Sequence, residues 1–222
     1  MLGASPAAPA SNAAVRPAVS AKKTPFDATP ITKHSQGLDQ FFSAITGQEG
    51  LNILDFAGAS QANISFITNL GHRISSEDYV RSLELAFLEG DFYANQADPE
   101  RAARFLHESL RFPQQFFDGA IVWDALQFLA PELLQPTVDR LYDILRPDSF
   151  LLAFFHADEK AAQVPLYTYR ISDQKSLLLT PRGHRARAQF FNNRGLEKLF
   201  HRFQSVKFFL TRDHLREIIV RR

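Results

Sequence analysis

Short apolar runs alternate with amphipathic stretches along most of this chain. The apolar runs, which predict strands, lie at about 51–56, 72–76, 119–124 and 149–155. Stretches with helical spacing of their apolar residues lie at about 38–45, 60–70 and 131–145. Strands that alternate with helices in this way predict a parallel, doubly wound α/β sheet. Ligands of such sheets bind at the carboxyl ends of the strands, where Asp55 and Asp124 are expected.

The segment between the second and third of these runs has a weaker pattern. Residues 79–90 have mixed periodicity. Asp98 is a good N-cap and Pro99 suits a first turn, so the two predict the start of a helix. A short strand is expected near 105–109, which would add one more strand to the sheet.

The C-terminal third of the chain predicts mainly strands. Residues 165–182 alternate around a polar Ser-Asp-Gln-Lys turn, which predicts a hairpin. Asn193 is expected to cap a helix over 194–202. Residues 205–222 predict two further strands joined at Asp213-His214.

Composition divides the 222 residues into a tail and one domain. Residues 1–35 are rich in Ala, Pro, Ser and Lys and include five Pro, so they offer too little apolar surface to offset the entropy of ordering. We therefore expect a disordered tail over 1–35 and one folded domain over 36–222. With 45% hydrophobic residues and 21 Phe, that domain can fill a core between a sheet and its helices.

Several classes of protein are excluded or unsupported. The chain has no Cys, which excludes disulfides and thiolate chemistry, and its seven His show no metal-binding spacing. No apolar run approaches the ~20 residues of a membrane span, and the N-terminus lacks a secretory signal. We expect a cytoplasmic protein with no membrane contact. No nucleophile elbow or phosphate-binding loop motif occurs, and the oligomeric state is not indicated.

Four segments, in order, resemble the class I S-adenosylmethionine-dependent methyltransferases. They are ILDFAGASQAN, GHRISSEDYV, ESLRFPQQFFDGAIVWDALQFL and PELLQPTVDRLYDILRPDSFLLAFFH, within roughly residues 38–222. The resemblance implies a Rossmann-like, mostly parallel seven-stranded sheet with an antiparallel C-terminal strand. It also implies S-adenosyl-L-methionine as cofactor and methyl transfer to an unidentified acceptor.

The resemblance also assigns cofactor-binding residues. They are Asp55, Ala57, Gly58 and Asn63 around the first loop, Asp78 for the ribose, Glu108 and Ser109 near the adenine, and Trp123 at the cleft. Asp78 lies 23 positions after Asp55, near the ~20-residue interval typical of a ribose-binding acid. Glu77 competes with it, and Asp55 or Asp78 alternatively caps a turn or a helix.

Two residues are candidates for the chemistry itself. Asp124 is expected to contact the methyl acceptor, and His156, at the end of a strand, is a candidate general base. The alternatives are an ordinary structural cap for Asp124 and a loop histidine without a role. In a methyltransferase the sulfonium is already activated, so alignment matters more than a catalytic triad.

Two other classes compete with the enzyme interpretation. Where the family has three glycines the chain has Ala57, Ala59 and Gln61, which motivates a competing interpretation, a binding or scaffold protein that keeps the fold without the activity. Residues 182–222 carry eleven basic and three acidic residues, and 181–194 place four Arg beside two Phe. That composition is compatible with an RNA-modifying enzyme, but a charged connection with buried phenylalanines is favoured.

Overall fold

A six-stranded sheet forms the centre of the protein. The computed structural model describes residues 29–211 and 214–222. In spatial order the strands are β3 (Arg73–Ser76), β2 (Asn52–Asp55), β4 (Phe117–Trp123), β5 (Leu145–His156), β9 (Leu215–Arg221) and β8 (Ser205–Leu210). The pairs from β3 to β5 are parallel, and β9 is antiparallel to both of its neighbours. The prediction of a mostly parallel α/β sheet with an antiparallel C-terminal strand is therefore confirmed.

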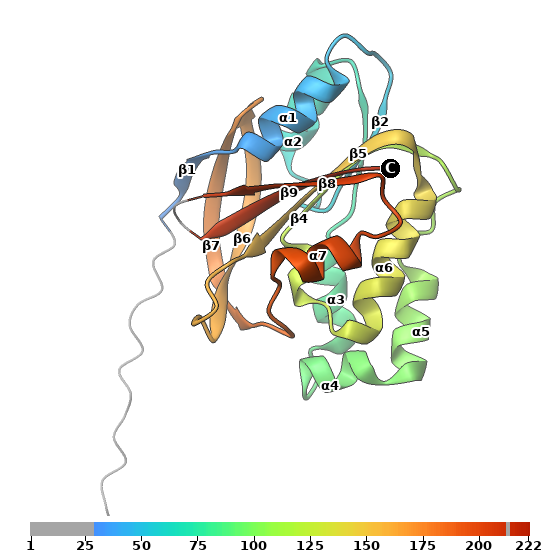
Figure 1. Cartoon of the computed structure of the whole chain (residues 1–222), viewed down its shortest axis with the longest axis vertical. Coiled ribbons are helices and arrows are strands. Elements are labelled where there is room, and N and C mark those ends of the chain that lie inside the picture. Colours follow the sequence, from blue (N-terminus) through green and yellow to red (C-terminus); the bar gives the residue numbers. More distant parts are fainter. Residues whose placement is uncertain (1–28, 212–213) are drawn as a thin grey trace, which may run out of the picture.

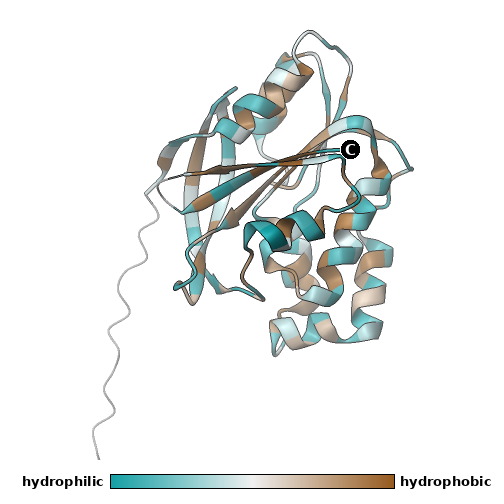
Figure 2. Cartoon of the chain, viewed as in Figure 1, coloured by the Kyte–Doolittle hydropathy of each residue, from teal (hydrophilic) through white to brown (hydrophobic). Residues whose placement is uncertain are grey.

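Helices cover both faces of this sheet (Figure 1). One face carries α1 (Gln36–Ile45) and α2 (Gln61–Asn69). The other face carries α3 (Tyr79–Phe87), α4 (Phe92–Ala97), α5 (Pro99–Glu108), the 3-10 helix η1 (Ala125–Phe128), α6 (Pro131–Ile144) and α7 (Asn193–Leu199). Hydrophobic residues concentrate on the strands between these layers, as Figure 2 shows. The core therefore lies on both sides of the sheet.

The prediction of seven strands in this sheet is wrong, because residues 105–109 do not form a strand. Asp98 accepts a hydrogen bond from Arg101 N and Pro99 occupies the first turn, as predicted, but the helix they start runs on to Glu108. Phe105 lies on its buried face. The helical register thus continues through the expected strand, and β3 has no strand on its outer side among the described residues.

A second, three-stranded sheet has the order β1-β7-β6. The predicted hairpin is confirmed as β6 (Gln163–Asp173) and β7 (Ser176–Ala186), but it forms a separate sheet with β1 (Ile31–His34). Residues 31–34 belong to the segment predicted as a tail, so the boundary at residue 35 is wrong. Residues 1–28 lie outside the described part of the chain.

Glu217 explains why the chain is ordered before residue 36. Its fully buried carboxylate accepts hydrogen bonds from Ser35 Oγ at 2.9 Å and from Gly37 N at 2.6 Å. Ser35 Oγ in turn caps α1 by accepting from Leu38 N at 3.0 Å. Strand β9 thereby fixes the junction between β1 and α1, a contact across about 180 residues that local composition does not reveal.

The remaining predictions differ mainly at element ends. The cap of α7 is Asn192 rather than Asn193, because the Asn192 side chain accepts from Gly195 N. Strands β8 and β9 are confirmed, while Asp213 at their predicted junction lies outside the described residues. Within the described ranges, no helix has both the length and the apolar character needed to cross a membrane.

Candidate functional site

Asp55 ends β2 and organises the carboxyl edge of the sheet. It is fully buried and accepts hydrogen bonds from Ala57 N at 3.1 Å, Trp123 Nε1 at 2.6 Å and Asn63 Nδ2 at 3.0 Å. Burial raises the pKa of Asp55, and the three hydrogen bonds oppose that shift. Both carboxylate oxygens therefore have partners inside the protein, and the residue holds the loop and β4 together.

Asn63 connects this carboxylate to the second sheet. Its Oδ1 accepts from Ile171 N at 2.8 Å, and its Nδ2 also approaches Tyr169 O at 3.4 Å. The side chain is fully buried. Strand β6 is thus bound directly to the first turns of α2, and the amide of Asn63 faces protein atoms on both of its polar ends.

The loop after β2 packs closely against the end of β3. Gly58 has φ +74°, and a Cβ at this position would lie 3.1 Å from Asp78 Cβ. Gly58 therefore supplies both the positive φ and the close approach. Ala57 forms an isolated bridge with Asp78, while Gln61 begins α2 with an exposed side chain. Gln61 stands where the family resembled by the sequence has a glycine. Its side chain is accommodated because α2 has already started at this residue.

Asp78 caps α3 and remains exposed. Its Oδ1 accepts from Arg81 N at 3.0 Å, which satisfies one free amide of the first turn. Asp55 ends β2, and Asp78 lies two residues beyond the end of the parallel neighbour β3, but only Asp78 has a carboxylate open to solvent.

Trp123, the single Trp of the chain, closes the centre of the site. It ends β4 with φ +48°, a conformation that is rare for a bulky residue. Its indole donates to Asp55 and stacks on the ring of Tyr169 with centroids 4.8 Å apart and an interplanar angle of 14°. Sequence analysis missed Tyr169, because its contact with β4 depends on the distant hairpin.

Asp124 follows Trp123 in the chain and is buried close to the Tyr169 hydroxyl. It is 3% exposed, and its Oδ2 accepts from Gln127 Nε2 at 3.3 Å. Burial raises the pKa of Asp124 to about 7, and the nearby Tyr169 hydroxyl and Arg182 lower it. Burial and the adjacent carboxyl raise the pKa of Tyr169 well above its usual value. An acid with a pKa near 7 can exchange a proton at neutral pH.

His156 is buried at the end of β5, apart from this pair. Its backbone N donates to Gln127 Oε1 at 3.1 Å, and its ring stacks on Tyr167 with centroids 6.2 Å apart. It does not line the cavity that Asp124 lines. Gln127 joins the two candidate catalytic residues, because its side chain contacts both.

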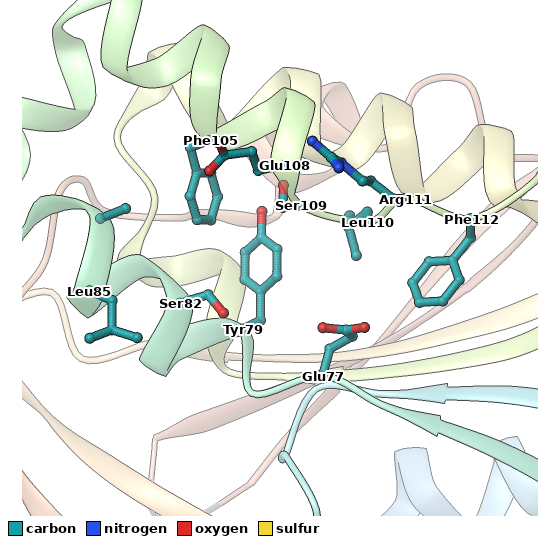
Figure 3. A pocket seen from close by; sticks show the side chains of 11 residues that line it. Glu77, Tyr79, Ser82, Leu85, Phe105, Glu108, Ser109, Leu110, Arg111 and Phe112 are labelled. Carbon is teal, nitrogen blue, oxygen red and sulfur yellow. The ribbon is translucent and has the colours of Figure 1, made fainter.

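Three cavities surround the end of β3. The strand-end chamber has a volume of about 160 Å³ and is lined by Trp123, Asp124, Tyr169 and Arg182. The loop cavity, about 480 Å³, lies over residues 57–62. Both are lined in part by Ala57, Asp78 and Thr168, so the two cavities are adjacent. A third, the edge cavity, has a volume of about 490 Å³ and contains Glu77, Glu108 and Ser109 (Figure 3).

The predicted cofactor residues are therefore divided between separate places. Ala57 and Asp78 line both the chamber and the loop cavity, Gly58 lines the loop cavity and Trp123 lines the chamber. Glu108 and Ser109 line the edge cavity. No cluster of three His, Asp or Glu side chains suited to a metal ion occurs in the described ranges.

The basic segment 181–194 is engaged within the protein. Arg185 forms an ion pair with Glu84 at 2.7 Å and lies 4.2 Å from the ring centroid of Phe92. Arg187 donates to Ala161 O at 2.7 Å, and Phe191 is buried. These contacts correspond to a charged connection, but Phe190 is exposed, so only one of its two phenylalanines is buried as expected.

Comparison with known proteins gives matches among solved structures. No family model and no curated protein matches the chain. A 1,6-didemethyltoxoflavin-N1-methyltransferase from Burkholderia thailandensis, solved with S-adenosylhomocysteine, is 17% identical over 83% of this chain and 75% of its own, with a TM-score of 0.46. A protein from Pyrococcus horikoshii OT3 is 12% identical over 83% and 88%, with a TM-score of 0.49. A glycopeptide N-methyltransferase complexed with S-adenosylmethionine is 13% identical over 84% and 94%, with a TM-score of 0.46. Any function of the cleft has to follow from this chain's own residues.

Proposed function

We propose that the protein binds S-adenosylmethionine at the carboxyl ends of β2, β3 and β4 and transfers its methyl group to a small acceptor. The observation that carries the proposal is the position of the exposed Asp78 carboxylate. It lies two residues beyond the end of β3 beside Gly58, and it lines both the strand-end chamber and the loop cavity. A carboxylate in this position can accept from two vicinal ribose hydroxyls.

The cavities set a condition on this binding. Sites for ligands of this size typically measure about 300–1,000 Å³, so the 160 Å³ chamber is too small alone. The loop cavity is large enough and adjoins it at Thr168 of β6. We infer that the cofactor spans both cavities and that β6 shifts at Thr168 to admit it.

The chain's own residues then have distinct tasks. S-adenosylmethionine supplies an activated methyl group, so the protein mainly has to bind and orient the two reactants. Asp55 shapes the loop through Ala57 and Trp123 rather than by contacting the ligand. Asp124 is placed to take a proton from an acceptor that loses one, with its pKa near 7 suited to that step.

A second candidate function is supported by a specific observation. Trp123 and Tyr169 stack in the middle of the strand-end cleft, and Asp55 has no free oxygen. In a binding scaffold that keeps the fold without the activity, Trp123 and Tyr169 would stay stacked and the cleft would stay closed. The two functions differ in whether any adenosyl ligand binds.

Replacing Asp78 with Ala is expected to weaken S-adenosylhomocysteine binding. The loss should be roughly 1.5–3 kcal/mol, because a charge-assisted hydrogen bond is removed. Titration calorimetry measures it, with Trp123 emission as a second readout. Asp91→Ala is the matched control, since it removes an equivalent exposed N-cap from α4, away from the cleft. Equal affinity in the two variants would rule out the ribose role of Asp78.

A further inference from the structure

Arg182 brings a positive charge to the strand-end chamber. It lies on β7, in the hairpin that packs beside the central sheet (Figure 1), and it lines the chamber together with Trp123 and Tyr169. Among the described residues its guanidinium forms no hydrogen bond and no ion pair, and its charge acts on Asp124 and Tyr169 only through space. Its donors are therefore available to a ligand.

Other arginines nearby are engaged within the protein. Arg185 pairs with Glu84 at 2.7 Å, and Arg187 donates to Ala161 O at 2.7 Å. Arginine binds carboxylates through two parallel N–H donors in a fixed geometry. A guanidinium that lines a cavity without a protein acceptor is thus suited to an anionic ligand.

The chamber has a buried wall and one exposed cationic end. Trp123 and Tyr169 are each 2% exposed and Asp124 is 3% exposed, whereas Arg182 is exposed to solvent. The Asp124 carboxylate accepts from Gln127 Nε2 on the buried side. A ligand that enters from solvent therefore meets the guanidinium first.

The hairpin as a whole favours anions at this entrance. Strands β6 and β7 carry Arg170, Arg182 and Arg185 and a single acid, Asp173, which lies at the turn. Arg170 lines the adjoining loop cavity. A cleft lined by charges of one sign raises the local concentration of oppositely charged solutes.

We propose that the methyl acceptor is a small carboxylic acid whose carboxylate binds the guanidinium of Arg182 at the exposed end of the strand-end chamber. One guanidinium matches the single charge and the planar oxygen pair of a carboxylate. Arg182 is thus a specificity residue that anchors the acceptor at a point away from its methylated group. This inference rests on the proposed methyl transfer, because it names the substrate class of the same site.

Ligand-observed NMR with benzoate and benzamide tests the anionic site. The two probes have nearly the same shape and differ in charge. Saturation transfer is expected to show that the wild type binds benzoate about tenfold or more tightly than benzamide, because the contact with Arg182 is charge-assisted. Arg182→Gln should remove most of this preference. Arg194→Gln, which removes an exposed arginine of the same basic segment outside both cavities, is the matched control and should keep it.

Titration of the same variants with S-adenosylhomocysteine separates this inference from the proposed function. A benzoate preference that is lost in Arg182→Gln, with little change in S-adenosylhomocysteine affinity, supports Arg182 as the acceptor anchor. If benzoate binding depends on Arg182 but S-adenosylhomocysteine does not bind, the anionic site is supported and methyl transfer is contradicted.

Two results would overturn the inference and leave the proposed function in place. The first is equal binding of benzoate and benzamide, or a preference for benzoate that survives Arg182→Gln. The second is a large loss of S-adenosylhomocysteine affinity in Arg182→Gln, because the guanidinium would then bind the carboxylate of the cofactor itself.

Discussion

Asp55→Ala is expected to destabilise the protein by about 3 kcal/mol or more. The substitution removes the acceptor of the buried Trp123 Nε1 and of the partly buried Ala57 N, and leaves Asn63 Nδ2 only its longer contact with Tyr169 O. Each buried donor without a partner costs about 1–3 kcal/mol, although the three losses will not add fully. Urea unfolding followed by circular dichroism measures the change in free energy.

Asp55→Asn gives the matched comparison. Its remaining oxygen can still accept from Trp123 and Ala57, but its amide group faces the Asn63 amide. We expect an intermediate loss of stability. If Asp55→Ala left the unfolding midpoint unchanged, the carboxylate would not hold the loop, and a direct role in ligand binding would have to be reconsidered.

Asp124→Asn is expected to change how stability depends on pH. Burial raises the pKa of Asp124 to about 7, against about 3.9 in an unfolded chain. Between these values the unfolded state has lost this proton while the folded state keeps it, so wild-type stability falls as pH rises through this window. Asparagine does not titrate, and its carbonyl can still accept from Gln127.

The variant should therefore gain stability relative to the wild type from about pH 4 to about pH 7, by on the order of a few kcal/mol. Urea unfolding at intervals of pH measures the difference, in which the shared contribution of Asp55 cancels. Asp91→Asn, at an exposed helix cap, is the control. A constant difference between Asp124→Asn and wild type over this window would show that Asp124 ionises normally.

The central sheet could be predicted because most of its strands carry an apolar run of their own, although β3 has a single apolar residue, Ile74. Strands β2, β4 and β5 are fixed by buried residues adjacent in sequence, such as Ile53 and Leu54. The prediction of a strand at 105–109 is wrong because the periodicity of these residues is weak. The helix that starts at Asp98 and Pro99 instead continues to Glu108. Strand β1 was missed because its anchor, Glu217, lies at the opposite end of the chain.

In the candidate site, the positions of the acidic residues could be predicted from the sequence, but their contacts could not. The spacing of Asp55 and Asp78 placed both at one edge of the sheet, as parallel strands require. Their different surroundings were not predictable, because Trp123 and Asn63 reach Asp55 only after the sheet and α2 have assembled. Tyr169 comes from a hairpin that packs across the strand ends, a contact that no local pattern encodes.

Calorimetric titration of the wild-type protein with S-adenosylhomocysteine tests the central claim most directly. The proposed function predicts one saturable site per chain, accompanied by a change in the emission of Trp123 as β6 shifts at Thr168. A folded wild-type protein that gives no saturable heat with this ligand or with S-adenosylmethionine would contradict the claim. The stacked Trp123 and Tyr169 would then be the permanent closure of a non-catalytic fold.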